Sequence, residues 1–415
     1  MKRNVVKIAA VAAGFLTVFS MTGCKVRYEK EEPVSENETI APPSTSVRVR
    51  YYNENLTPFF EKCEKEYEAA HTDTDIILDL QGTDDYIVKI DSDSANPNTC
   101  PDVYMINNSD LGTAYLGGLT YKNSYDIYNS ENYCETAINA CSYAGNLIAY
   151  PLFYNTSFLL YNKDYIKEKD VVTFETLKNY SQNVDFTNKE DSKIQAVFRT
   201  DVSDLFLNYG YLGNGMDIGG PAGDDANKLD LENDLVLEGV TEYKALIDYF
   251  HLTAKSDAAD CLDKFYSGKI LSTVANSENI RQIIEKNINF GVAAFPDYDI
   301  SIKTTPLSIT TALVVNPYSA NTEKASDFAK FATYDEAYSL YGTSYCFTSR
   351  RGADYPVKTL QNMYGSYEKS VSKNKLLYGN QVYPLLEIAI HNIVAGEDTK
   401  EELKKVSEYM KTQLQ

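Results

Sequence analysis

Strand and helix signals alternate between residues 47 and 106, and this alternation limits the folds open to the chain. Apolar and polar residues alternate over 47–51, as in a half-buried strand, and apolar residues then recur at helical spacing from Phe59 to Ala70. A second strand signal over 75–80, a helix signal over 84–95 and a third strand signal over 102–106 follow. This βαβαβ order predicts an α/β fold with parallel strands covered by helices.

The rest of the chain continues the mixed pattern. Thr173 is a suitable N-cap for a helix over 174–184, and six glycines between 210 and 223 predict a loop or hairpin. The tail over 385–414 has helical spacing with a break at Gly396. Further strand signals lie at 149–154, 158–163, 271–274, 290–294 and 312–315.

The N-terminus has the order of a secretory signal peptide over 1–23. A basic tip precedes an apolar run over 8–19, which is shorter than the about 20 residues that span a bilayer. Cys24 directly follows Thr22 and Gly23, which resembles the lipobox of bacterial lipoproteins. The resemblance implies that the Cys24 thiol carries a diacylglycerol. We therefore expect a protein anchored by lipid on the extracytoplasmic side of the cell membrane.

Residues 24–46 are charged, rich in Pro and Ser and poor in large apolar groups, so we expect a disordered tether. The whole chain carries 59 acidic and 39 basic residues, a net charge of −20, which becomes −23 without Lys2, Arg3 and Lys7. Such a charge argues against nucleic acid or an anionic membrane surface as a partner. A neutral or cationic ligand remains compatible with it.

The composition gives no sign of a metal, a cofactor or catalysis. The chain has no C-x-x-C and only three histidines, and it lacks the G-x-S-x-G, phosphate-loop and H-E-x-x-H motifs. No carboxylate pair stands out as that of a glycosidase. Cys134 and Cys141 lie about 10 Å apart if they share one helix, too far for a disulfide, while other cysteine pairings stay open. We expect a non-enzymatic protein without a cofactor.

Several motifs occur in an order that resembles the extracellular solute-binding proteins of ABC importers, in the carbohydrate-binding group that includes maltose-binding protein. The tryptophans that this family often places in its cleft are absent, and Phe174 stands in one such motif. Leu307 to Thr310 replaces a glycine-rich triplet of the family. The matching stretches are Pro101-Asp102-Val103, residues 145–163, Thr173 to Leu177, residues 290–296, residues 325–337 and the tail from Ile393.

The resemblance implies a two-lobe fold of the type II periplasmic-binding-protein kind, each lobe a mostly parallel sheet flanked by helices, with a hinge between them. Crossing strands are expected near 151–154 and 301–310. The N-terminal lobe would comprise 47–152 plus about 305–345. The C-terminal lobe would comprise 153–304 plus about 346–415. The ligand would lie in the cleft between the lobes.

The ends of parallel strands face such a cleft, so side chains there are the candidates for ligand binding. Amides and carboxylates bind sugar hydroxyls, and the 34 tyrosines supply ring faces in a chain without tryptophan. The candidates are Tyr52, Asn53, Asp84, Asp85, Asn107, Tyr154, Asn155, Asn276, Ser277, Tyr345 and Arg350.

The function that the resemblance implies is that of the substrate-binding component of an ABC importer. We expect a monomer that captures a carbohydrate, an oligosaccharide, and delivers it to the permease subunits. Three alternatives stay open: a receptor for a cationic solute such as a polyamine, a surface sensor or adhesion protein with the same fold, and an extracellular glycosidase. Salt dependence of binding would separate the cationic ligand from the neutral one.

Overall fold

The computed structural model describes residues 45–184, 193–255 and 257–414. The expected signal peptide, Cys24 and most of the expected tether lie outside the described residues. The first strand begins at Thr45, so Thr45 and Ser46 belong to the sheet and not to the tether as predicted. Among the helices of the described part, none is both long and apolar enough to cross a membrane.

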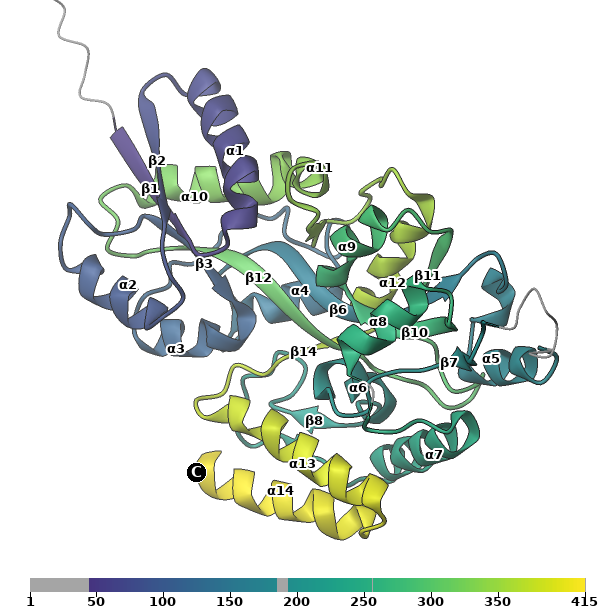
Figure 1. The fold of residues 1–415 in the computed structure, drawn as a ribbon. Coiled ribbons are helices and arrows are strands. Elements are labelled where there is room, and N and C mark those ends of the chain that lie inside the picture. Colours follow the sequence, from purple (N-terminus) through teal and green to yellow (C-terminus); the bar gives the residue numbers. More distant parts are fainter. Residues whose placement is uncertain (1–44, 185–192, 256, 415) are drawn as a thin grey trace, which may run out of the picture. The chain divides into compact units, whose positions relative to one another are not determined.

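Within the described residues, ten strands form one sheet, whose main order is β2-β1-β3-β12-β6-β10-β7 (Figure 1). The strands are β1 (Thr45–Tyr51), β2 (Thr74–Leu80), β3 (Val103–Asn107), β6 (Tyr150–Asn162), β7 (Ala196–Phe198), β10 (Ile270–Asn276), β11 (Phe290–Ala294), β12 (Leu307–Val315), β13 (Phe347–Thr348) and β14 (Val371–Ser372). The predicted strand signals at 149–154 and 158–163 are one continuous strand, β6.

Strands β6 and β12 connect the two ends of the sheet. The first half of β6 pairs with β12, and its second half pairs with β10 and β11. The expected crossing at 151–154 lies in β6, whereas β12 begins only at Leu307, late in the expected range 301–310. The boundaries given to the two lobes stay predictions.

The expected sheets of mostly parallel strands are in fact mixed. Strand β1 pairs in parallel with β2 and β3, and β10 with β7. However, β6 and β12 run antiparallel to each other and to the strands β3 and β10 beside them. The sheet is mixed because β12 runs opposite to β3, and β6 runs opposite to both β12 and β10.

Helices cover both faces of the sheet (Figure 1). Thr173 accepts a hydrogen bond from Thr176 N and caps α5 as predicted, while Gly396, at a left-handed φ of 112°, ends α13 and divides the tail in two. The helices are α1 (Thr57–Ala70), α2 (Tyr86–Ser94), α3 (Leu111–Leu116), α4 (Glu135–Ala140), α5 (Phe174–Ser181), α6 (Leu205–Leu212), α7 (Asp234–Phe250), α8 (Ala258–Tyr266), α9 (Ile280–Glu285), α10 (Thr322–Lys330), α11 (Leu340–Ser344), α12 (Asn362–Glu368), α13 (Val382–Ala395) and α14 (Thr399–Leu414).

Two short hairpins complete the fold. β4 (Ser142–Tyr143) pairs with β5 (Asn146–Leu147), and β8 (Asp217–Ile218) pairs with β9 (Leu229–Asp230). The second hairpin takes up part of the glycine-rich stretch, whose first glycine, Gly210, lies in α6. The six cysteines of the described part are free, and Cys134 and Cys141 flank the short helix α4.

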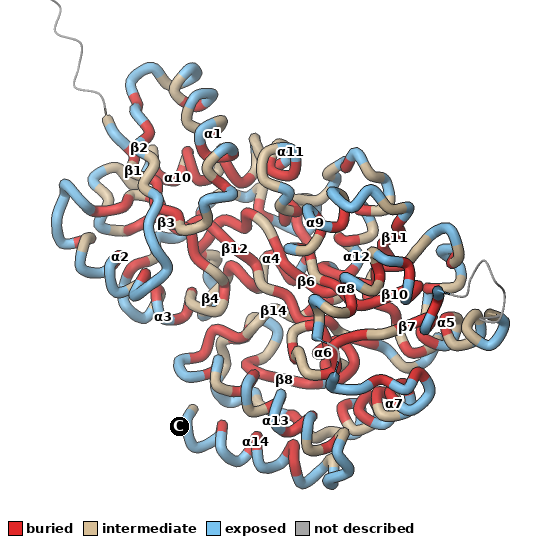
Figure 2. The backbone as a smooth tube through the Cα atoms, viewed as in Figure 1, coloured by how far each residue is buried: buried red, intermediate tan, exposed pale blue. Residues whose placement is uncertain are grey.

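The strands in the middle of the sheet are buried along most of their length (Figure 2), and successive side chains pack on opposite faces of the sheet. On β6, Leu152, Tyr154 and Leu160 belong to a cluster that extends along one face of the whole sheet, and Leu159 faces the other way. The opposite face carries two separate clusters, one around β3 and α3 and one around α6, α7 and α13.

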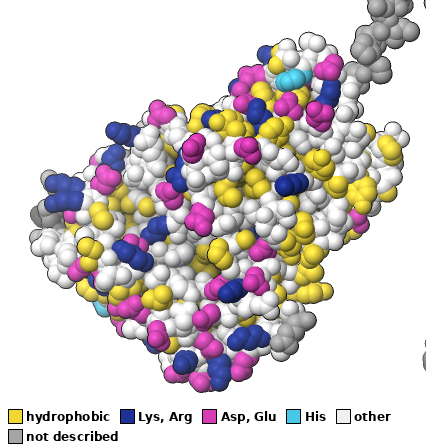
Figure 3. Space-filling model, turned by 180° about the vertical axis from the view of Figure 1, so that it is seen from behind, with side chains coloured by type: hydrophobic (Ala, Val, Ile, Leu, Met, Phe, Trp, Pro, Cys, Tyr) yellow, Lys and Arg dark blue, Asp and Glu magenta, His cyan; other side chains and the backbone are white. Residues whose placement is uncertain are grey.

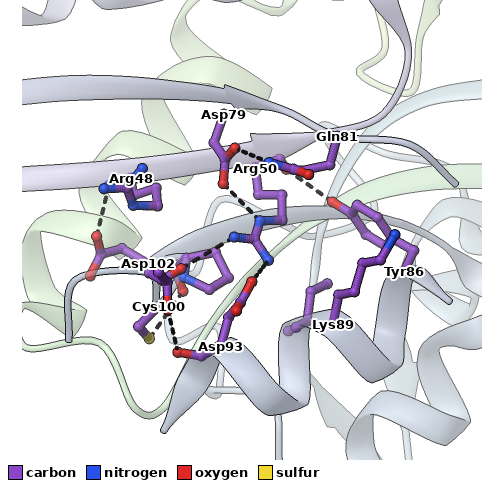
Figure 4. A network of polar contacts seen from close by, with 12 residues as sticks. Arg48, Arg50, Asp79, Gln81, Tyr86, Lys89, Asp93, Cys100 and Asp102 are labelled. Carbon is purple, nitrogen blue, oxygen red and sulfur yellow. Dashed lines mark hydrogen bonds and ion pairs between the residues drawn. The ribbon is translucent and has the colours of Figure 1, made fainter. Parts of the chain in front are cut away.

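A buried ion triad fixes α2 on the sheet (Figure 4). Arg50 on β1 is only 4% exposed, and its guanidinium donates to Asp79 on β2 at 2.8 Å and to Asp93 on α2 at 2.6 Å. The Tyr86 hydroxyl at the start of α2 donates to the Arg50 carbonyl. These contacts hold both ends of α2, through Tyr86 at its start and Asp93 near its end, against the carboxyl ends of β1 and β2.

Candidate ligand-binding site

Cavity 1 lies where chain segments that follow β1 and β10 meet the crossing strand β6. Its volume is about 360 Å³. Asn53 and Asn55 come from the loop after β1, and Ser277 begins the one-turn helix η4 (Ser277–Asn279) after β10. The lining residues are Asn53, Asn55, Phe153, Tyr154, Asn155, Ser277, Glu278, Arg281, Ser344, Tyr345, Cys346 and Phe347.

Cavity 2, of about 340 Å³, lies at the carboxyl ends of β2 and β3. The Tyr52 ring packs edge-on against Tyr86, with 5.0 Å between the ring centroids. Asp85 adopts a left-handed conformation with φ of 52°, which turns the chain into α2 at the rim of the cavity. The lining residues are Tyr52, Thr83, Asp85, Tyr86, Ile87, Val88, Ile106, Asn107 and Asp110.

Cavity 3, of about 480 Å³, lies beside the start of β12, at the edge of the core cluster around α6 and α13. Asp204 caps α6 by accepting a hydrogen bond from Leu207 N, so the polar loop before this helix faces the cavity. The lining residues are Asp201, Ser203, Asp204, Leu205, Phe206, Leu307, Lys373, Tyr383, Pro384 and Glu387.

The structure places eight of the eleven predicted residues at two of these cavities. Those at cavity 1 are Asn53, Tyr154, Asn155, Ser277 and Tyr345, and those at cavity 2 are Tyr52, Asp85 and Asn107. Their role in binding stays a prediction. Tyr52 and Asn53 are adjacent in the chain, so the segment that follows β1 contributes to both cavities.

The other three predicted residues do not line any of the three cavities. Asp84 is exposed beside Asp85, and the Asn276 side chain caps η4 by accepting from Glu278 N. Arg350 lies 3.7 Å above the Tyr334 ring and donates Nη1 to the Tyr334 carbonyl. Its cation is therefore used to pack the chain after β13 and does not face the cleft.

Two predicted residues at cavity 1 also hold the fold together. Ser277 N donates to Asn155 Oδ1 at 3.1 Å, and Ser277 Oγ accepts from Thr156 N at 3.2 Å. These bonds tie η4 to the middle of β6, where its pairing changes from β12 to β10. Tyr154 is 1% exposed and stacks on Tyr367 at 4.0 Å, so mainly the edge of its ring can reach a ligand.

Lys373 is the residue that sequence reasoning missed most clearly. Its Nζ lies 5.1 Å from the centroid of the Tyr383 ring, and no hydrogen bond or ion pair to Nζ is formed within the described residues. Burial lowers the pKa of Lys373, while Asp110 and Asp204 act in the opposite direction. Burial also raises the pKa of Asp110. The ammonium thus has donors available for a ligand.

Tyr383 and Glu387 were also missed, because the sequence marks them only as part of a helical tail. Both lie on α13 four residues apart, on one face of the helix, and line cavity 3. An aromatic residue and a carboxylate four residues apart could have been read as a ligand-binding pair, but this spacing is common on helices and does not single out a site.

Within the described residues, no group of three or more His, Cys, Asp and Glu side chains could hold a metal ion. The face seen in Figure 3 carries acidic and basic side chains interspersed, without a continuous basic area. The groups that line the three cavities include amides, carboxylates, tyrosine rings and two cations, Arg281 and Lys373.

Known structures with the same fold include the extracellular solute-binding protein of Staphylococcus aureus in complex with maltose. It has a TM-score of 0.78 at 20% identity and covers 90% of this chain and 98% of its own. A cyclo/maltodextrin-binding protein complexed with maltotetraose gives a TM-score of 0.77 at 17% identity, over 91% of this chain and 99% of its own. The predicted two-lobe α/β fold is confirmed.

Proteins that are similar to this chain in sequence are also solute-binding proteins. The maltodextrin-binding protein MdxE of Bacillus subtilis is 22% identical over 80% of this chain and 78% of its own length. A maltooligosaccharide ABC transporter solute-binding lipoprotein of Streptococcus pneumoniae is 24% identical over 59% of this chain and 58% of its own. The family model for bacterial extracellular solute-binding proteins matches residues 62–358. This chain therefore belongs to the bacterial extracellular solute-binding protein family.

Proposed function

We propose that the chain is the substrate-binding component of an ABC importer and that it captures a neutral oligosaccharide of the maltodextrin type. The observation that carries the proposal is a set of three cavities lined in part by polar side chains that follow strands: one at β6, one at the carboxyl ends of β2 and β3, and one beside the start of β12. Relatives whose names state maltodextrin or maltooligosaccharide binding support the choice of ligand.

The lining groups suit sugar recognition. The amides of Asn53 and Asn55 and the carboxylates of Asp85 and Asp110 can bind hydroxyl groups in pairs. The Tyr345 ring is 37% exposed, and the Arg281 guanidinium lies over it at 5.6 Å from the ring centroid. The ring can contact the C–H bonds of a sugar while the guanidinium donates to its hydroxyls. Because tyrosine offers less area than tryptophan, hydrogen bonds must supply more of the affinity.

Closure of the two lobes around the ligand would give the importer a form that it can distinguish from the empty receptor. Such a receptor works as a monomer, without catalysis, beside the permease subunits. The proposal includes a lipid anchor at Cys24 and a tether that keeps the protein at the extracytoplasmic face of the membrane.

Isothermal calorimetry against glucose, maltose, maltotriose, maltotetraose and spermidine tests the ligand. We expect binding of the maltooligosaccharides and none of spermidine. Tight binding of spermidine with no response to any sugar would contradict the proposal and favour the receptor for a cationic solute. Such a cation would be opposed by Arg281 and Lys373. The acidic side chains that it would meet are Asp85, Asp110, Asp201, Asp204, Glu278 and Glu387.

A measurement of sugar uptake distinguishes a role in transport from a role as a sensor or adhesion protein. Deletion of the gene in the source bacterium should abolish uptake of radiolabelled maltotetraose, and the full chain with Cys24 should restore it. Unchanged uptake, together with sugar binding by the purified protein, would favour a sensor.

A further inference from the structure

A fourth cavity, which we call the distal cavity, lies away from the cleft. Its volume is about 430 Å³, and it is lined by Tyr121, Lys122, Ser124, Tyr125, Tyr150, Thr322, Glu323 and Ser326. Tyr121 N donates to the carbonyl of Val315, which pairs with Val103 at the first residue of β3. Asn107 at cavity 2 is the last residue of β3, about 13 Å further along the strand.

The Tyr150 hydroxyl at this cavity has no hydrogen bond of normal geometry. Tyr150 is fully buried, and within the described residues the Ser326 side chain is near enough to lower the pKa of Tyr150 against the effect of burial, but no well-formed hydrogen bond joins the two hydroxyls. Burial raises the pKa of Tyr150, so the hydroxyl keeps its proton. A buried hydroxyl without a partner is unfavourable, and a bound molecule that exchanges a hydrogen bond with it would remove this penalty.

The walls of the distal cavity combine ring faces with hydroxyl groups. Tyr121 is 43% exposed, and the half-buried Tyr125 ring packs edge-on against Tyr150 at 6.3 Å. Three hydroxyl side chains, those of Ser124, Thr322 and Ser326, also line the cavity. This is the combination that fits a ring with C–H bonds on its faces and hydroxyls on its edge.

Charge narrows the ligand further. One cation, Lys122, and one anion, Glu323, line the distal cavity, so the two charges balance at its wall. A charged ligand would meet one of them as a like charge, whereas a neutral polyhydroxylated ligand can accept from Lys122 and donate to Glu323.

We propose that the distal cavity is a second binding site, which holds one ring of a neutral sugar. The Tyr150 hydroxyl exchanges a hydrogen bond with a sugar hydroxyl at the floor, and the Tyr121 ring packs on the face of the sugar. The proposal stands on this cavity alone and does not depend on which solute the cleft binds. With one exposed ring and few hydrogen bonds, we expect millimolar affinity.

The absence of tryptophan from the chain allows a direct test. Tyr121→Trp places one fluorescent reporter at the distal cavity, and Tyr409→Trp on α14, a tyrosine of similar exposure at 47%, is the matched control. Glucose and maltotetraose are the probes. We expect a saturable emission change with either probe in Tyr121→Trp and none in Tyr409→Trp. No saturable change with both probes in Tyr121→Trp would overturn the proposal.

A second variant separates binding at the distal cavity from a signal transmitted from the cleft. Tyr150→Phe in the Tyr121→Trp protein removes only the hydroxyl, and we expect binding to weaken about five-fold. The melting temperature should stay the same or rise, because an unpartnered buried hydroxyl is lost. Unchanged affinity in this double variant would overturn the proposal. If Tyr150→Phe does not fold, Ser326→Ala at the same floor takes its place, with the same expectation for affinity.

Discussion

Arg50 and Lys373 each have two aspartates as their nearby charges, but only Arg50 touches them. Arg50 contacts Asp79 and Asp93 at 2.8 and 2.6 Å. Asp110 and Asp204 influence Lys373 electrostatically, yet neither carboxylate comes within 4.0 Å of its Nζ. The two arrangements have the same charges and different geometry.

The difference separates a structural role from a ligand-facing role. All contacts of Arg50 are made inside the protein, where its guanidinium also donates to the Thr99 carbonyl, so the triad fixes α2 and the wall of cavity 2. Lys373 lies in cavity 3 with its donors unused, and Asp110 lies in cavity 2. Charges that the fold does not pair remain available to a bound molecule.

Removal of Arg50 should have the largest effect on stability. Arg50→Met leaves Asp79 buried without its partner, and we expect the free energy of unfolding to fall by about 3 kcal/mol. Urea unfolding followed by circular dichroism measures it. Arg48→Met is the control, because Arg48 donates to the Asn98 carbonyl at an exposed position, and its loss should stay below about 1 kcal/mol. Equal stability of the Arg50 variant and wild type would contradict the structural role of the Arg50 triad.

Removal of Lys373 should affect binding more than stability. We expect Lys373→Met to weaken maltotetraose binding about ten-fold in calorimetry, because a charged donor to the sugar is lost. The unfolding free energy should change by less than about 1 kcal/mol, since no hydrogen bond or ion pair of the ammonium is lost and only its contact with the Tyr383 ring is removed.

Lys369→Met is the contrasting variant for this experiment. Lys369 Nζ donates to the Phe295 carbonyl, to Asp297 and to Thr304, at 2.7, 2.7 and 3.0 Å. We expect this variant to lose stability and to retain most of its affinity. The reverse pattern in the two variants would show that Lys373 is the structural lysine.

Lys375 is a buried cation that is bonded to backbone carbonyls, unlike Arg50, which is paired with carboxylates, and Lys373, which is unpaired within the described part of the chain. Its stability effect can be tested by a change of pH. It is 1% exposed, its Nζ donates to the Asn139 carbonyl at 2.6 Å, and burial lowers its pKa to about 8. Above that pH the folded protein releases this proton, while the unfolded chain holds it up to about pH 10. The unfolding free energy therefore gains about 1.5 kcal/mol from Lys375 as the pH rises from about 8 to about 9.5.

Urea unfolding of wild type and Lys375→Met at both pH values isolates this effect. Other lysines, such as Lys369, titrate in both proteins and cancel in the difference. A variant whose stability rises with pH as much as that of wild type would show that Lys375 carries no such penalty.

Salt should have the smallest effect on ligand binding. A neutral oligosaccharide forms no ion pair, so calorimetric affinity should change less than about two-fold between about 50 and 500 mM NaCl. A steep loss of affinity would mean that the ligand is a cation bound by Asp110 and Asp204, and would contradict the proposal of a neutral sugar as the ligand.

The sequence could predict features that local periodicity or a cap determines. The alternation over 47–51 predicts β1, Thr173 predicts the start of α5, and Gly396 predicts the end of α13. The loops after β1 and β10 could be proposed as walls of a cleft because the ends of parallel strands have one place to meet.

Lys373 and Arg350 show what local patterns cannot predict. Lys373 follows a two-residue strand and is positioned by Asn108, whose side chain donates to the Lys373 carbonyl across 265 residues. Arg350 is turned away from the cleft by Tyr334 and Tyr338, which stack on its guanidinium. Such long-range contacts leave no periodic signal along the chain.

The most direct test of the account is a crystal structure of the chain with maltotetraose. We predict that the sugar lies in the cleft formed by cavities 1, 2 and 3, with Lys373 Nζ within about 3 Å of a sugar hydroxyl and the Arg50 triad unchanged. A structure in which Lys373 pairs with Asp110 or Asp204 and does not touch the bound sugar would contradict it.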